Sequence, residues 1–68
     1  MSQLQPHQQR VVDERRELDT KIEALSVFIR DNPVFLNLDA AEQARLKYQS
    51  AAMADYSYIL GERIGAFK

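Results

Sequence analysis

The sequence predicts an all-α protein in which two long antiparallel helices form a hairpin. Apolar residues between positions 10 and 29 recur on one side of a helix. A proline then interrupts the chain at position 33, and beyond it apolar residues recur every seven positions from 46 to 67. A chain of 68 residues is expected to form one small domain, residues 1–68.

The first helix is expected to run from about residue 6 to about residue 30. Pro6 suits a first helical turn, where its missing N–H costs little. The same stretch carries nine charged residues between positions 10 and 23, so its apolar stripe is narrow and needs a partner. That stripe consists of Val11, Leu18, Ile22, Leu25 and Ile29.

Residues 31–39 are predicted to connect the two helices. Pro33 biases Asn32 away from the helical region and so ends the first helix. The apolar residues that follow are too few for a paired strand, and they indicate an apolar connector or a single turn that plugs one end of the hairpin. They are Val34, Phe35, Leu36 and Leu38.

The second helix is expected to run from about residue 40 to about residue 66. Asp39 fits an N-cap, with Glu42 as the acid three residues later. The apolar heptad comprises Leu46, Met53, Leu60 and Phe67. Beside it runs a line of small residues that would let another helix approach closely, namely Ser50, Ala54, Ser57, Gly61 and Gly65.

The apolar arc of the second helix is wider than the stripe that the first helix can offer. A short chain without cysteine also lacks disulfides and thiolate zinc sites as means of stabilisation. We therefore expect a homo-oligomeric helical bundle. A monomeric hairpin with an exposed patch remains the alternative.

Composition narrows the class of function. Nine basic and ten acidic residues interleave, which disfavours binding to DNA or RNA polymers but leaves a small anionic ligand open. We find no signal peptide and no apolar run of membrane-spanning length, so a soluble cytoplasmic protein without a membrane partner is expected. No catalytic motif and no metal-ligand spacing is present, so we expect no enzyme activity, no metal and no cofactor.

Three side chains are candidates for binding a small anion, and each has a simpler interpretation. His7 offers a flat ring for stacking on a base, or is an exposed residue of the first turn. Lys21 offers a charge for phosphate, or supports the helix through Glu17. For Arg63 the two interpretations are an anion-binding residue in a cavity between subunits, or a side chain whose guanidinium stays in solvent. His7 and Lys21 are fourteen residues apart, about 21 Å along a helix, so one small ligand can touch both only between subunits.

Two stretches of the chain carry a family resemblance. The first is Gln8-Gln9-Arg10-Val11-Val12-Asp13-Glu14, followed by Glu17-Leu18-Asp19, Lys21-Ile22-Glu23, Leu25 and Phe28. The second is Glu42-Gln43-Ala44-Arg45-Leu46, followed by Met53, Asp55-Tyr56-Ser57 and Leu60-Gly61-Glu62-Arg63-Ile64. In this order, with the proline break between them, they resemble small phage anti-CBASS proteins from residue 7 onward.

This resemblance implies a sponge that sequesters cyclic oligonucleotide messengers in the host bacterial cytoplasm without cleaving them. It implies a short N-terminal helical segment before two long helices, and a compact homohexamer with cyclic dinucleotide pockets between subunits. Lys21 matches the family's pocket lysine, and His7 falls at or beside a position where the family usually has tyrosine. Gln8 and Arg63 are the nearest matches to a separate cyclic trinucleotide site.

A protein–protein adaptor without a small-molecule ligand is the alternative function. In that case the heptad of the second helix would dock a helix of a host or phage protein.

Overall fold

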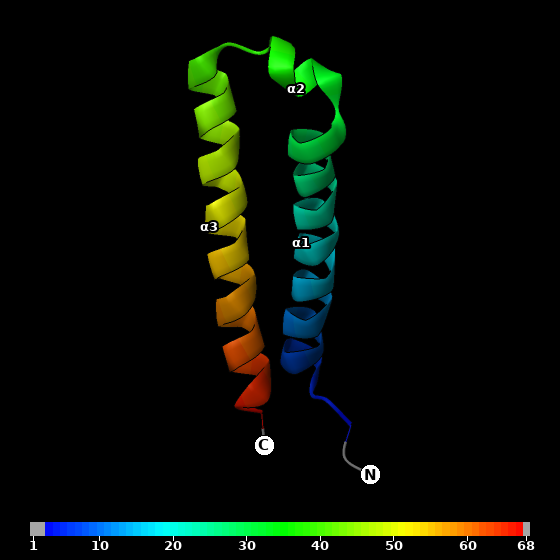
Figure 1. The fold of residues 1–68 in the computed structure, drawn as a ribbon. Coiled ribbons are helices and arrows are strands. Elements are labelled where there is room, and N and C mark those ends of the chain that lie inside the picture. Colours follow the sequence, from blue (N-terminus) through cyan, green and yellow to red (C-terminus); the bar gives the residue numbers. More distant parts are fainter. Residues whose placement is uncertain (1–2, 68) are drawn as a thin grey trace.

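The chain folds into a two-helix hairpin, as the computed structural model of residues 3–67 shows (Figure 1). Helix α1 spans Pro6–Asp31, α2 spans Pro33–Asn37 and α3 spans Ala40–Gly65. α1 and α3 run antiparallel along their whole length, so the two ends of the chain lie at the same end of the molecule. The predicted all-α hairpin is confirmed.

Local signals set the boundaries of α1. The backbone N–H of Gln5 donates to Gln8 Oε1 at 2.8 Å, and Pro6 occupies the first helical position. At the other end Asn32 is extended (φ −89°, ψ 121°) because it precedes Pro33. The expected bounds of about 6 and 30 therefore hold to within a residue.

The short N-terminal helical segment needs correction. Within residues 3–67, the short helix is α2, and it lies between the two long helices rather than before them. The physical reason is local, since residues 7–31 contain neither glycine nor proline and α1 continues unbroken from its first turn.

α2 closes one end of the hairpin. Its first turn is capped by Asn32 Oδ1, which accepts from the Val34 N–H at 2.9 Å. Phe35 is buried and meets the ring of Phe28 edge to face, with 6.1 Å between centroids. Leu36 remains 75% exposed. The predicted plug is thus one phenylalanine ring rather than the whole apolar segment.

Gln43 of α3 holds this closed end together. Its Nε2 donates to the carbonyl oxygens of Phe35 and Leu38, both at 3.0 Å. α3 itself begins as predicted, because Asp39 Oδ1 accepts from the Glu42 N–H at 2.7 Å. The Gln43 amide therefore links α2 and the residue after it to the first turns of α3.

The core lies between the two long helices. Leu60 is fully buried, and Val11 and Leu18 of α1 pack with it. The half-buried residues around them are Ile22, Met53, Ile64 and Phe67. The heptad predicted in the second helix therefore points at α1.

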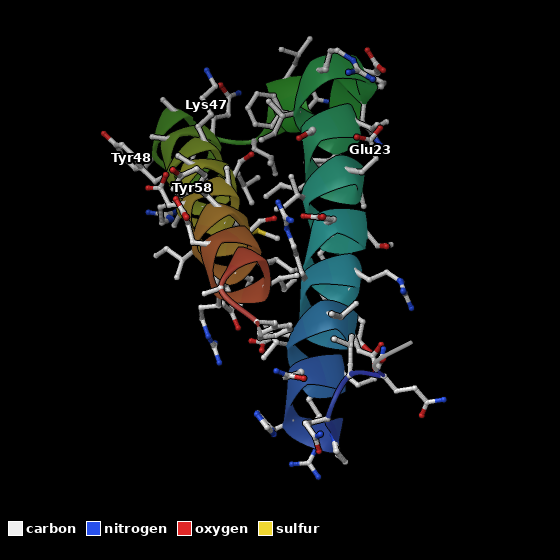
Figure 2. The ribbon with its side chains drawn as sticks, turned by 90° about the horizontal axis from the view of Figure 1, so that it is seen from below. Glu23, Lys47, Tyr48 and Tyr58 are labelled. Carbon is white, nitrogen blue, oxygen red and sulfur yellow. The ribbon has the colours of Figure 1, made fainter. Side chains whose placement is uncertain are left out.

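The opposite side of α3 is exposed and carries large side chains. Tyr48 is 76% exposed, Tyr58 67% and Ile59 56%. Figure 2 shows Tyr48 and Tyr58 pointing away from α1. Among residues 3–67, no helix is long and apolar enough to cross a membrane.

Candidate functional site

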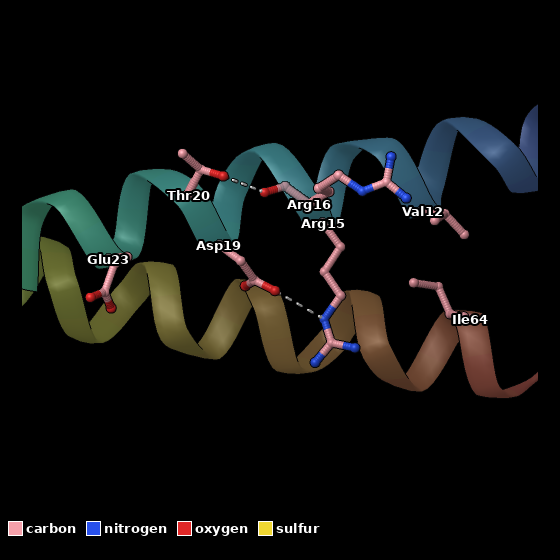
Figure 3. A pocket seen from close by; sticks show the side chains of 7 residues that line it. All are labelled: Val12, Arg15, Arg16, Asp19, Thr20, Glu23 and Ile64. Atoms are coloured by element: carbon pink, nitrogen blue, oxygen red, sulfur yellow. Dashed lines mark hydrogen bonds and ion pairs between the residues drawn. The ribbon is translucent and has the colours of Figure 1, made fainter.

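A polar cluster crosses the interface between α1 and α3. Ser57 is buried, and its hydroxyl donates to Asp19 Oδ1 at 2.5 Å. Ser57 Oγ also accepts from Arg15 Nε at 3.3 Å, and Arg15 Nε lies 3.9 Å from Asp19 Oδ2. Figure 3 shows Arg15 and Asp19 together beside α3. Because these bonds need one alignment of the helices, the cluster favours a single register.

Gly61 makes room for this cluster. A Cβ atom built on Gly61 would lie 2.9 Å from the guanidinium carbon of Arg15, closer than such atoms approach in real proteins. The absence of a side chain on Gly61 therefore lets the Arg15 guanidinium rest on the backbone of α3. Gly65 has no comparable neighbour within 4 Å.

A groove of about 650 Å³ runs beside the cluster (Figure 3). It is lined mostly by one flank of α1, with one residue contributed by α3. Its lining residues are Val12, Arg15, Arg16, Asp19, Thr20, Glu23 and Ile64. A smaller hollow of about 280 Å³ lies on the other side of Arg15, against Tyr58 and Glu62.

The electrostatics of the groove do not favour a polyanion. Arg16 lies 3.7 Å from Asp13, and Arg15 is held by Asp19 and Ser57. Glu23 adds a further carboxylate to the wall. Since carboxylates partly neutralise both arginines, a phosphate entering the groove would meet nearly balanced charge. In the smaller hollow, a hydrogen bond to Glu62 raises the pKa of Tyr58 above its ordinary value.

The four predicted ligand residues lie elsewhere. His7 is exposed in the first turn of α1, and Gln8 receives the capping bond from Gln5. Lys21 is exposed midway along α1 and makes no ion pair within residues 3–67, so the predicted pair with Glu17 is not formed. Arg63 is exposed in the last turn of α3.

A single chain does not bring His7 and Lys21 together. They lie within about 40° of each other around the axis of α1, but about 21 Å apart along it. Lys21 is two residues from Asp19 and from Glu23, which places it on the side of α1 away from the groove. Any ligand that contacts both predicted residues must therefore use a second subunit.

Part of the polar cluster follows from local spacing along α1. The pairing of Arg15 with Asp19 follows from their i,i+4 spacing. The role of Ser57 does not, because its partners are 38 and 42 residues away in sequence. Its position in the line of small residues was the only signal available.

The protein is thus a small all-α hairpin whose candidate ligand residues lie apart from one another, with His7, Lys21 and Arg63 exposed and Gln8 half-buried. The model of the Sequestin family matches residues 5–66, and the chain belongs to that family. The match agrees with the resemblance noted in the sequence, and the family name points to sequestration of a ligand. No curated protein and no solved structure matches the chain.

Proposed function

We propose that this protein binds and sequesters a cyclic oligonucleotide messenger at pockets between subunits and does not cleave it. In this proposal it is a phage anti-CBASS sponge that works in the bacterial cytoplasm as a homo-oligomer, by resemblance a hexamer. Cyclic dinucleotides are the expected ligands, with cyclic trinucleotides as a further class.

The family match over residues 5–66 carries this proposal. The geometry of α1 supports it, because His7 and Lys21 face the same side, are exposed, and are too far apart for one ligand within one chain. Residues from two copies can complete such a site. Lys21 supplies a charge for phosphate, and the His7 ring supplies a face for a base.

The alternative function, a protein–protein adaptor, has less support, because its expected docking surface is used within the hairpin. The heptad proposed to dock a foreign helix is largely taken up by packing against α1, since Leu60 is fully buried and Met53 and Phe67 pack around the core. A partner helix could bury the whole heptad only by displacing α1, since Leu60 is fully covered by it.

Isothermal titration with a panel of cyclic di- and trinucleotides tests the proposal. Lys21→Ala is expected to weaken binding by about 1–3 kcal/mol, because a charge-assisted bond to phosphate is lost. The matched control is Lys47→Ala, since Lys47 lies over the Phe35 ring near the closed end, 5.9 Å from its centroid. Absence of heat with every nucleotide at micromolar protein would reject the sponge, and equal affinity for the Lys21 variant would remove that residue from the site.

Sequestration and cleavage are separated by recovering the ligand. After incubation and heat denaturation of the protein, mass spectrometry should return the cyclic nucleotide intact and in stoichiometric amount. Appearance of linear products that increase with time would contradict a sponge.

A further inference from the structure

The outward face of α3 carries a second heptad that the hairpin does not use. One half of this pattern is Ala41, Tyr48, Asp55 and Glu62, and the other half is Arg45, Ala52, Ile59 and Ala66. All eight residues are exposed. The spacing of four, three, four and three continues from the first turn of α3 to its C-cap. Five of the eight residues are alanine, tyrosine or isoleucine and three are charged, so the face combines apolar contact positions with charges that can select a partner.

The side chains on this face suit close helix packing. Small alanines alternate with the two large apolar residues Tyr48 and Ile59, which are 76% and 56% exposed. On one flank, at the same seven-residue spacing, lie Ala44, Ala51, Tyr58 and Gly65, so this flank is small except at Tyr58. Small residues allow the backbones of two helices to approach, and the exposed tyrosine and isoleucine then lose contact with water.

The charges on this face select an antiparallel partner that is a second copy of α3. When two copies are paired so that residue numbers add to 107, three of the four kinds of layer are complementary. The central one sets Asp55 against Ala52 and brings the two Asp55 side chains within about 4.5 Å of each other along the axis, which is the one unfavourable charge contact of this pairing. The layers are Ala41 with Ala66, Arg45 with Glu62, Tyr48 with Ile59, and Ala52 with Asp55. On one rim, Glu42 falls close to Arg63 of the second copy.

A parallel pairing of the same two faces is disfavoured. It would place Arg45 on Arg45, Asp55 on Asp55 and Glu62 on Glu62, and like charges in the centre of a helix pair are destabilising. In the single chain Arg45 already contacts Glu42 at 2.8 Å, in a solvent-exposed pair that contributes little. Antiparallel docking extends this pair into a network with Glu62 and Arg63 of the second copy.

We propose that α3 docks on α3 of a second copy, antiparallel and two-fold symmetric, through this outward heptad. The inference rests on the self-association that the proposed function requires, and it names one of the contacts that hold the subunits together. It also puts Arg63, a predicted ligand residue, at the rim of a subunit interface.

Molar mass by light scattering of the full chain tests the docking face. The molar mass of the wild type should be at least twice the 7.9 kDa of one chain. Ile59→Glu should lower this molar mass, because it places an acid opposite Tyr48 of the second copy. Leu36→Glu is the control, because Leu36 is 75% exposed but lies on α2. Circular dichroism verifies that both variants remain helical. An Ile59→Glu variant with wild-type mass would overturn the proposal.

A charge exchange tests the pairing of Arg45 with Glu62. Arg45→Glu and Glu62→Arg should each weaken association about tenfold, whereas the double variant should recover most of the loss. Because Arg45→Glu also removes the exposed ion pair with Glu42 inside α3, circular dichroism verifies that each variant keeps its helix content. A double variant no better than the single ones would overturn this pairing.

Cysteine crosslinking tests the orientation, since the chain has no cysteine of its own. Chains carrying Ala41→Cys, mixed with chains carrying Ala66→Cys, should form a disulfide between copies under mild oxidation. Either variant alone should not, because identical residues are then about 37 Å apart along the pair. Crosslinking of Ala41→Cys chains to themselves would indicate parallel docking and overturn the proposal.

The experiments distinguish a wrong docking face from a wrong proposed function. A wild type that forms the dimer but binds no cyclic nucleotide leaves the docking face in place and rejects the proposed function. A wild type that is a higher oligomer, but is insensitive to all of these variants, keeps the proposed function open and rejects the face. A wild type of 7.9 kDa with and without nucleotide rejects both.

Discussion

The inward face of α3 is buried against α1 whereas its outward face is exposed, although both repeat every seven residues. Leu60 has no exposed surface, and its neighbour Ile59 is 56% exposed. The inward face has larger apolar side chains and a hydrogen-bonding serine, and the outward face has alanines, tyrosines and charges of both signs. One helix therefore carries one face for folding and another that we assign to assembly.

The two faces should respond differently to substitution. A change on the inward face should alter the free energy of unfolding at any protein concentration. A change on the outward face should act only where the protein associates, because ligation by a second copy stabilises by mass action. The four predictions below follow this contrast, from the largest expected effect to the smallest.

Leu60→Ala should destabilise the chain by about 2–5 kcal/mol, since it removes a fully buried side chain from the centre of the core. For a domain of this size such a loss can exceed the margin of stability. Urea denaturation followed by circular dichroism measures it. Leu36→Ala, at a residue 75% exposed, is the control and should change stability by no more than about 0.5 kcal/mol. Similar losses for both variants would contradict the assigned core.

Ser57→Ala should destabilise by about 1 kcal/mol, because Asp19 loses its hydrogen-bond donor and Arg15 its acceptor. The effect is moderate because both ionic side chains are partly exposed and water can replace the hydroxyl. Ser50→Ala, in the same line of small residues, makes no side-chain hydrogen bond within residues 3–67 and should be nearly neutral. Equal urea midpoints for the two variants would argue against the cluster.

The two glycines of α3 should differ in their response to alanine. Gly65→Ala should stabilise by up to about 0.5–1 kcal/mol, because alanine favours the helix and nothing lies within 4 Å. Gly61→Ala should stabilise the chain less than Gly65→Ala does, or should destabilise it. The reason is that the new Cβ must displace the Arg15 guanidinium from Ser57. Thermal unfolding of both variants measures the difference, and an equal gain would show that Arg15 moves at no cost.

Tyr48→Ala should have the smallest effect on the fold. In dilute protein its unfolding free energy should stay within about 0.5 kcal/mol of the wild type, because Tyr48 is 76% exposed. In concentrated protein the wild type should gain stability that the variant lacks. Urea curves at two concentrations test this, and a large loss in dilute protein would place Tyr48 in the monomer's own packing.

Most of the fold could be predicted because its signals are local. Pro6, Pro33 and Asp39 act within a few residues of the helix ends that they set. The inward heptad indicated the packed face of α3 because helical periodicity is a property of the sequence. The position of the short helix was different from the expected one, since that expectation came from the resemblance and not from a break in residues 7–31.

The candidate site was only partly predictable. The distance between His7 and Lys21 follows from helix geometry and needed no tertiary information. Whether two copies bring these residues together depends on contacts that helical periodicity does not specify. The line of small residues likewise indicated close packing at Gly61 without revealing that an arginine rests there.

The sequence by itself determined which residues form helices, where those helices end, which face of α3 packs inward, and the family to which the chain belongs. Only the tertiary structure decided that Ser57 joins Asp19 to Arg15, and that Gln43 fastens α2 by its carbonyl groups. The reason is physical. Caps and periodicity depend on neighbours within one or two turns. The bonds of Ser57, in contrast, join residues 38 and 42 positions apart and exist only once the register of the two long helices is fixed.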